Sequence, residues 1–168
     1  MKWRLLTVLV LAFGLCAGSA LAQVDPFGTM DTVVLVPSVV PDPGAGQYTL
    51  ILDLYVYSDE PIVGATVGFK WDNPKVVMDS AVGSPLVTAG FDLGRFFYEN
   101  NSITLTNANK RFLFGGASLF SSVAGDGSGR RLWASYYFST PGWTALDAVT
   151  FDSLPYSGGT EYLFVDDK

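Results

Sequence analysis

The sequence predicts an all-β protein, a β-sandwich of antiparallel strands, and three observations support this fold class. Apolar and polar residues alternate with a period of two in several segments, and no long segment keeps the 3.6-residue period of an amphipathic helix. Glycine and proline together supply 18 + 9 = 27 residues, and many of them gather in short clusters between those segments. Many short strands joined by frequent turns are typical of sandwiches and not of alternating α/β folds.

The first 22 residues predict a secretory signal peptide. Lys2 and Arg4 form a basic start, an apolar run follows over residues 5–16, and residues 20–22 read Ala-Leu-Ala, a small-residue cleavage signal. The apolar run is about a dozen residues long, whereas a membrane-spanning helix needs roughly 20. We therefore expect cleavage before Gln23 and a secreted protein, extracellular or at the cell surface, without membrane insertion.

The chain that remains is acidic and lacks two reactive residue types. The whole sequence has 10 basic and 16 acidic residues, so removal of Lys2 and Arg4 leaves 10 − 2 = 8 basic residues and a net charge of 8 − 16 = −8. This charge disfavours nucleic acid as a partner, because binding it relies on clustered Lys and Arg. The single cysteine, Cys16, belongs to the signal peptide, and histidine is absent. Disulfides, Ser-His-Asp catalysis and Cys-His catalysis are therefore excluded from the mature chain.

Two long strands are the clearest elements. Residues 47–58 place Leu52 and the other even-numbered apolar residues on one face and Ile51 on the opposite face. Residues 62–71 repeat the alternation after a turn at 58–61, which contains Ser, Asp and Pro. This arrangement predicts two strands joined by a turn, each with one apolar face.

The other expected elements are shorter. Further strands are expected at residues 32–36, 76–79, 102–106, 111–114, 131–139, 148–151 and 162–165. Turn clusters separate them at residues 41–44, 71–74, 107–109, 125–129 and 157–159. Residues 85–93 leave room for a helical turn. We assign residues 31–168 to a single domain, preceded by a short leading segment at residues 23–30.

The order of several motifs resembles that of the cohesin-like domain of secreted bacterial proteins. A strand ends in the aromatic-Asp-x-Pro corner Trp71-Asp72-Asn73-Pro74, and the next strand carries the run Val76-Val77-Met78-Asp79-Ser80-Ala81. Later motifs follow in the same order: Phe114-Gly115-Gly116, Gly125-Asp126-Gly127, Phe151-Asp152-Ser153 and Glu161-Tyr162-Leu163-Phe164-Val165-Asp166. The similarity extends from about Asp31 to Asp167.

The resemblance implies a fold, a partner class and a location. The implied fold is a jelly-roll or immunoglobulin-like sandwich of about nine antiparallel strands, related in architecture to carbohydrate-binding modules. Cohesins bind dockerin modules through one face of a sheet, so the implied partner is a protein such as a dockerin-like module, with polysaccharide as the alternative. Many relatives are extracellular or cell-surface proteins.

Outward-facing aromatic residues are the candidate ligand-binding site. If Leu132, Ala134 and the residues at the same parity face the core, Trp133 and Tyr137 point outward on the strand 131–139, roughly 13 Å apart at about 3.3 Å per residue. Tyr55 and Tyr57 form a second outward pair on the strand 47–58. Flat aromatic side chains can stack on sugar rings or anchor a protein partner. The alternative is that a loop or neighbouring side chains cover them.

Carboxylates are plentiful, but their spacing singles out no catalytic pair. A glycosidase needs an acid and a base or nucleophile about 5 to 10 Å apart. Asp59-Glu60 and Asp166-Asp167 lie in turn or terminal positions, where acidic residues are common. We therefore assign no catalytic residue and expect a non-enzymatic recognition or structural module. The alternative is a secreted carbohydrate-active enzyme that uses paired carboxylates.

Calcium is the cation that this composition could bind, because calcium takes oxygen ligands. The segment Gly125-Asp126-Gly127-Ser128-Gly129 is similar to one unit of a calcium-binding glycine repeat, but the same glycines suit a hairpin turn with positive φ. Asp72-Asn73 before Pro74 is likewise typical of a turn. We therefore assign no cofactor and no metal ligand.

Overall fold

The computed structural model describes residues 31–42, 47–123, 127–144, 147–154 and 162–166, with the backbone alone described at residues 41, 42, 47 and 162–166. The predicted signal peptide and the leading segment lie outside the described residues, as do Gly125, Asp126 and Asp167. None of the helices in the described part of the chain has the length and apolar character that a membrane-spanning helix needs.

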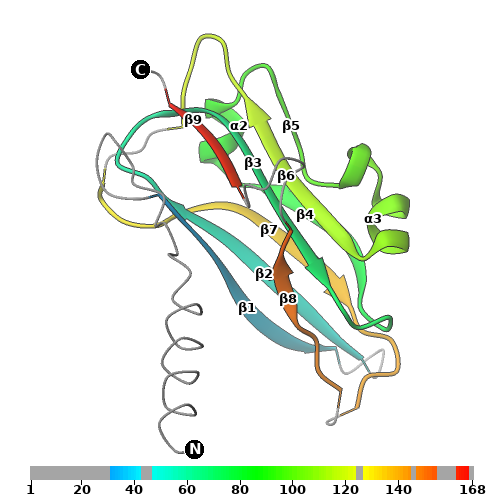
Figure 1. Ribbon diagram of the computed structural model, residues 1–168. Helices are drawn as coiled ribbons and strands as arrows, with labels where there is room; N and C mark the ends of the chain where they lie inside the picture. The colour runs from blue at the N-terminus through cyan, green and yellow to red at the C-terminus, as the bar shows by residue number, and fades with distance from the viewer. Residues whose placement is uncertain (1–30, 43–46, 124–126, 145–146, 155–161, 167–168) are drawn as a thin grey trace, which may run out of the picture.

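Two antiparallel sheets pack face to face (Figure 1), which confirms the predicted β-sandwich. The first sheet has the order β1-β2-β7-β4, with strands β1 (Thr32–Asp42), β2 (Gln47–Tyr57), β7 (Arg131–Ser139) and β4 (Val77–Gly83). The second has the order β5-β6-β3-β8, with strands β5 (Gly94–Phe96), β6 (Arg111–Ala117), β3 (Ile62–Trp71) and β8 (Phe151–Ser153). Strand β9 (Tyr162–Asp166) pairs with the first part of β3, residues 62–67, whereas β8 pairs with the last part, residues 69–71.

Helices close one side of the sandwich, where the edge strands β4 and β5 lie (Figure 1). They are α2 (Pro85–Gly90), the 3-10 turn η1 (Glu99–Asn101) and α3 (Ile103–Asn109). The helical turn expected within residues 85–93 is confirmed as α2, which begins with Pro85 in its first turn, where a proline removes no helical hydrogen bond.

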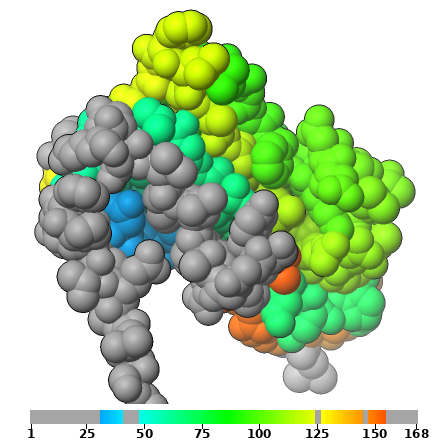
Figure 2. All heavy atoms as spheres, turned by 45° about the horizontal axis from the view of Figure 1, so that its top comes forward, coloured from blue at the N-terminus to red at the C-terminus, as the bar shows by residue number. Residues whose placement is uncertain are grey.

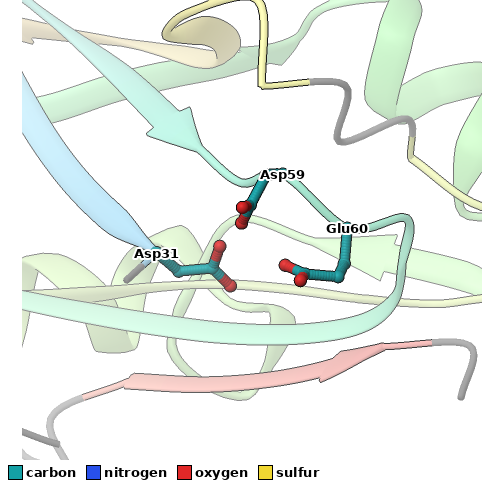
Figure 3. Close-up of side chains that lie close together, drawn as sticks. All are labelled: Asp31, Asp59 and Glu60. Atoms are coloured by element: carbon teal, nitrogen blue, oxygen red, sulfur yellow. The ribbon is translucent and has the colours of Figure 1, made fainter. Parts of the chain in front are cut away.

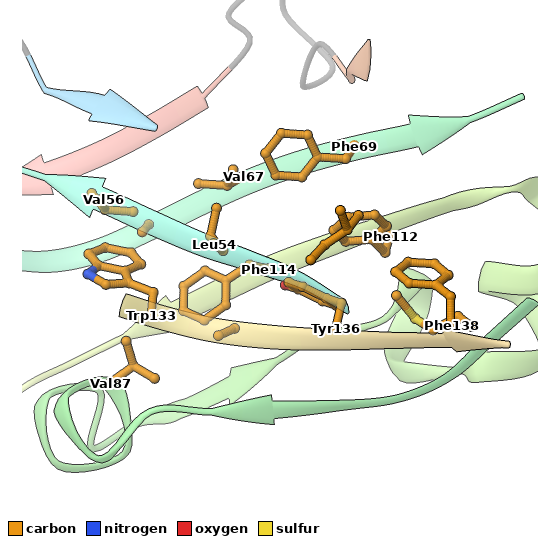
Figure 4. Packing of buried hydrophobic residues seen from close by; sticks show 14 of the residues in the cluster. Leu54, Val56, Val67, Phe69, Val87, Phe112, Phe114, Trp133, Tyr136 and Phe138 are labelled. Carbon is orange, nitrogen blue, oxygen red and sulfur yellow. The ribbon is translucent and has the colours of Figure 1, made fainter. Parts of the chain in front are cut away.

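The core lies between the sheets and is built from the predicted apolar faces. Leu52 is 1% exposed and Phe69 is 5% exposed, whereas Ile51 on the opposite face is half-buried, as expected from the alternation. Aromatic rings fill the centre (Figure 4), with the ring centroids of Phe112 and Tyr136 4.4 Å apart. Such packing stabilises the fold without disulfides, because each buried aromatic ring removes a large apolar area from water.

The corner after β3 is held by specific hydrogen bonds. The indole Nε1 of Trp71 donates to the carbonyl of Val76 at 3.0 Å, and Asn73 Oδ1 accepts from the backbone N–H of Lys75 at 2.9 Å. The carboxylate of Asp72 accepts from the backbone N–H of Thr150 at 2.9 Å. The predicted turn is therefore confirmed, and it ties β3 to the segment that leads into β8.

The strand expected at residues 102–106 is wrong, because this segment is the start of α3. Ser102 acts as the N-cap and its Oγ accepts from the backbone N–H of Leu105 at 3.3 Å. Lys110 ends the helix in a left-handed conformation with φ 53°. The Ile-Thr-Leu-Thr alternation suggested a strand, but a capped helix fits the space beside β4.

Other strand boundaries differ from the sequence prediction. Strand β1 continues to Asp42, β4 covers Val77–Gly83, and β8 covers Phe151–Ser153 instead of residues 148–151. Strand β5 has three residues and was not expected, since Gly94–Phe96 is too short for an alternation to be recognised.

Side chains cap the outer edge of β4. The amide of Asn107 on α3 accepts from the backbone N–H of Met78 at 2.7 Å and donates to the Met78 carbonyl at 2.9 Å. The hydroxyl of Tyr98 accepts from the backbone N–H of Ala81 at 3.0 Å. These contacts replace a neighbouring strand, because they satisfy main-chain groups that an edge strand leaves open.

Candidate functional site

The solvent-facing side of the β1-β2-β7-β4 sheet carries three tyrosines. Tyr55 and Tyr57 lie two residues apart on β2, with parity opposite to the buried Leu54. Tyr137 lies on β7, where it pairs with Ile51. All three tyrosine side chains are half-buried. Their predicted outward orientation is confirmed, and their part in ligand binding stays a prediction.

Three exposed valines lie on the same side of this sheet. Val36, Val40 and Val82 are 44%, 49% and 55% exposed, and the register places Val36 beside Asp53 and Val82 beside Ser135. Asp53 accepts a hydrogen bond from the Ser135 hydroxyl at 2.5 Å, so the charge at the centre of the sheet has a partner. We call this surface the tyrosine face and define it by Tyr55, Tyr57, Tyr137, Val36, Val40 and Val82.

The prediction that Trp133 points outward is wrong. Trp133 is 2% exposed, and its ring lies 5.3 Å from that of Phe114 and 5.5 Å from that of Phe91 (Figure 4). The reason is a β-bulge: Leu54 pairs with Ala134 and Tyr55 pairs with Leu132, so Trp133 is an extra residue between them. A bulge shifts the alternation by one residue, which turns Trp133 into the core and Leu132 toward the tyrosine face.

Three carboxylates converge at one end of the first sheet (Figure 3). Asp31 precedes β1, and Asp59 and Glu60 lie in the turn between β2 and β3; carboxylate oxygens of all three lie within 4.8 Å of one another. The pairing of Thr32 with Tyr57 brings these residues together. Glu60 is only 6% exposed, and two hydrogen bonds between the Ser58 hydroxyl and the Glu60 backbone hold the turn.

This acidic cluster offers oxygen ligands that suit a hard cation, but its geometry is incomplete. Calcium takes six to eight oxygen ligands, and the cluster supplies three carboxylates. It therefore does not by itself define a metal site. The pair Asp59-Glu60, which was considered in the sequence, therefore lies together with a third carboxylate, that of Asp31.

The two other motifs considered for calcium are consistent with turns. Gly127 and Gly129 have φ values of 65° and 126°, which glycine adopts without strain. The side chain of Asp72 accepts a hydrogen bond from the backbone N–H of Thr150, and the side chain of Asn73 accepts one from the backbone N–H of Lys75. Hydrogen bonding by the Thr150 backbone N–H lowers the pKa of Asp72, which keeps this carboxylate ionised in its structural role.

An apolar tip, which the sequence analysis missed, lies beyond the end of β6. Leu93, Leu119 and Phe120 are 58%, 66% and 94% exposed, and the segment 118–123 protrudes from the surface (Figure 2). Asp92 holds the tip, since its carboxylate accepts from the backbone N–H of Leu119 at 2.8 Å and of Phe120 at 3.0 Å. The signal in the sequence is the apolar pair Leu119-Phe120 among serines.

An open hollow of about 470 Å³ lies next to β5. Its lining residues are Gly94, Arg95, Phe96, Asn100, Asn101 and Leu113. Phe96 can lie flat on β6 because Gly115 has no side chain: a Cβ there would lie 2.0 Å from the Phe96 ring. The lining includes one cation, Arg95, two amides and no carboxylate.

The same arrangement of sheets occurs in solved structures of cohesins. The chain superposes with a TM-score of 0.51 on a cohesin from Clostridium thermocellum in the Coh-OlpC-Doc435 cohesin-dockerin complex, at 9% identity, over 86% of each chain. A type III cohesin module from the cell-surface anchoring scaffoldin ScaE of Ruminococcus flavefaciens gives a TM-score of 0.50 at 11% identity, over 82% of this chain and 73% of that one. The fold is that of a cohesin module.

The resemblance inferred from the sequence is therefore confirmed for the fold. No protein-family model and no curated protein sequence matches the chain. At identities of 9% and 11% the likeness to cohesins concerns the fold and not the binding residues. The binding properties of this cohesin-like sandwich therefore depend on its own surfaces, which are the tyrosine face, the acidic cluster, the apolar tip and the hollow.

Proposed function

We propose that this chain is a secreted, non-enzymatic recognition module that binds a partner protein through the tyrosine face. The observation that carries the proposal is the composition of that face: three half-buried tyrosines and three exposed valines on one side of a sheet. Tyrosine suits such a role, since its ring brings a large apolar area with a polar tip. Contiguous exposed apolar patches on globular proteins commonly mark interaction sites.

A protein module of the dockerin type is the partner class that we favour. The cohesin fold supports this choice, because one of the solved cohesins with this fold is in complex with a dockerin. The net charge of 8 − 16 = −8 that remains after removal of the predicted signal peptide adds a preference for a partner that carries basic residues around its apolar contact.

The distribution of carboxylates favours recognition over catalysis. The hollow beside β5 has no carboxylate in its lining, so a sugar bound there would meet no acid-base pair of the kind that glycosidases use. The acidic cluster lies at one end of the first sheet and is not part of the lining of this hollow, and its Glu60 is buried.

Binding to a panel of dockerin modules tests the proposal. The exported chain is immobilised and dockerins of several types are passed over it. The double variant Tyr55→Ala/Tyr137→Ala should weaken retention at least about tenfold, since two aromatic anchors are removed. Leu105→Ala is the matched control, because Leu105 is 41% exposed on α3 and lies off the tyrosine face. Equal retention of wild type and double variant would reject this face.

Polysaccharide is the second candidate ligand, and the same three tyrosines favour it. Aromatic side chains on the outer face of a sheet can stack on sugar rings. A panel of insoluble and soluble polysaccharides distinguishes the ligand classes, with the same variants and control. Retention without release of reducing sugar would support a carbohydrate-binding module, whereas release of reducing sugar would indicate the enzyme alternative.

Secretion is tested by the N-terminus of the exported protein. The basic start, the apolar run and the Ala-Leu-Ala triplet support cleavage before Gln23. Mass spectrometry of exported protein should find Gln23 as the first residue. Detection of Met1, or of a lipid on Cys16, in the exported protein would contradict the signal-peptide prediction.

A further inference from the structure

Two carboxylates lie on the outer side of the first sheet, among the residues of the tyrosine face. Asp53 on β2 accepts a hydrogen bond from the Ser135 hydroxyl at 2.5 Å, and Asp79 on β4 accepts one from the Ser139 hydroxyl at 3.0 Å. Both serines lie on β7 with the same outward parity as Tyr137. The sheet thus holds both carboxylates in place, and a fixed group loses little conformational freedom when a partner binds it.

The spacing of the two carboxylates follows from the register of β7. Ser135 and Ser139 are four residues apart on one strand, which is roughly 13 Å at about 3.3 Å per residue. Tyr137 lies midway between the two serines. Strands β2 and β4 lie on opposite sides of β7, so Asp53 and Asp79 lie diagonally across Tyr137. A central aromatic side chain is therefore flanked by two negative charges.

No cation from the strands of this sheet balances the two carboxylates. Strands β1, β2 and β4 contain no Lys or Arg, and β7 contains only Arg131, its first residue. Arg131 pairs with the buried Val56, and its guanidinium donates to the Ser128 hydroxyl at 2.8 Å. A partner that covers the tyrosine face must therefore bring positive charge to Asp53 and Asp79, because a carboxylate that loses its water without gaining a cation destabilises a complex.

The position of these carboxylates in the sheet also selects the kind of partner. Strands β2 and β7 are inner strands with a neighbour on each side, so a partner strand cannot add to them, and contact is made through side chains. A helix suits such a surface, because its backbone groups bond within the helix and its side chains at i, i+3, i+4 and i+7 form one face. Residues i and i+7 lie about 10.5 Å apart at about 1.5 Å per residue. Long, flexible basic side chains reach the few ångströms that remain.

We propose that the tyrosine face binds an amphipathic helix of the partner that carries basic residues at positions i and i+7 and apolar residues at i+3 and i+4. The basic residues contact Asp53 and Asp79, and the apolar pair covers Tyr137. This inference rests on the proposed function, since it names the chemistry of the partner for the same face. Asp53 and Asp79 are then specificity-determining residues, because they favour a basic helix and repel an acidic one.

Two synthetic peptides of equal composition, each held helical by an internal cross-link, test this proposal on the exported chain. One carries Lys at i and i+7, and the other carries its two Lys three positions apart, about 4.5 Å along the axis. Calorimetric titration should show at least about tenfold tighter binding of the first peptide. Asp53→Asn and Asp79→Asn should each weaken its binding about fivefold. The melting temperature should stay unchanged, since the Asn oxygen still accepts the serine hydrogen bond. Asp152→Asn is the control, because it removes one exposed charge on β8 of the other sheet.

The outcomes separate this proposal from the proposed function. Equal binding of the two peptides, or no binding of either at about 1 mM, a concentration at which even weak contacts are populated, would overturn the proposal. So would an affinity that Asp53→Asn and Asp79→Asn leave unchanged. The proposed function is judged by the loss of dockerin retention in Tyr55→Ala/Tyr137→Ala. If that loss occurs while the two peptides bind alike, the tyrosine face is a binding site for a partner of different chemistry, and only the present proposal fails.

Discussion

The hydroxyl of Tyr136 lies in the middle of the aromatic core. Tyr136 is fully buried, and among the described residues its hydroxyl has no hydrogen-bond partner. Burial raises the pKa of this hydroxyl well above its ordinary value, so it stays neutral. A buried polar group without a partner destabilises a fold, whereas the ring around it stabilises the core through its contacts.

We expect Tyr136→Phe to stabilise the protein by about 1 kcal/mol, because the ring remains and the unsatisfied hydroxyl is removed. Urea unfolding of variant and wild type measures the change. Tyr98→Phe is the control with the opposite sign, since the Tyr98 hydroxyl accepts the bond from Ala81. A loss of more than about 1 kcal/mol in Tyr136→Phe would show that the hydroxyl has an internal partner.

Trp133 is expected to be a core residue in solution as well. Trp133→Ala should reduce the free energy of unfolding by about 3 to 5 kcal/mol, the range for removing a buried aromatic side chain. Thermal and urea unfolding provide the measurement, and Tyr137→Ala on the outer face should have a much smaller effect. A melting temperature unaffected by Trp133→Ala would place the indole outside the core and would contradict the bulge.

At the scale of elements, α3 acts as a substitute for a neighbouring strand. Its Asn107 satisfies both main-chain groups of Met78 on the edge of β4, and η1 anchors the helix through a bond of 2.8 Å from the Glu99 backbone N–H to Thr106 Oγ1. A covered edge does not recruit other strands. The helix therefore helps to prevent a further strand from joining the first sheet, which has four strands in the part of the chain that the structure describes.

Asn107→Ala should lower the free energy of unfolding by about 1 to 3 kcal/mol, because Met78 would be left with unsatisfied main-chain groups. Amide hydrogen exchange should show faster exchange at Met78, with Thr104→Ala as the control on the exposed side of the same helix. Unchanged protection of the Met78 amide would mean that water replaces Asn107 without loss.

At the scale of the whole molecule, buried and bonded carboxylates couple stability to pH. Glu99 is 4% exposed, and its carboxylate pairs with Arg111 and accepts from Asn109 at 2.8 Å. The Arg111 guanidinium lowers the pKa of Glu99, and hydrogen bonds likewise lower the pKa of Asp92 and Asp147. Carboxylates with a lowered pKa in the folded state stabilise the fold above their unfolded pKa, and this contribution is lost as pH falls.

Glu99→Gln should therefore be less stable than wild type at pH 7 and should approach wild type near pH 3, below the ordinary glutamate pKa of about 4.3. Urea unfolding at a series of pH values gives the two curves. Parallel curves for the variant and wild type would show that the pair with Arg111 contributes nothing to the pH dependence. Asp79→Asn, on the exposed edge, is the control.

The sequence by itself determined the fold class, the long strands β2, β3 and β7, and the core faces of β2 and β3, because alternation with a period of two is a local property. It also indicated the outward tyrosines and the cohesin resemblance, which the fold confirms. Only the tertiary structure decided the side of Trp133, the helical state of α3 and the grouping of Asp31 with Asp59 and Glu60. Each of these three features depends on a contact with another segment of the chain. A bulge is defined only relative to its partner strand, and a capped helix must fit beside β4. The acidic cluster forms where β1 and β2 pair.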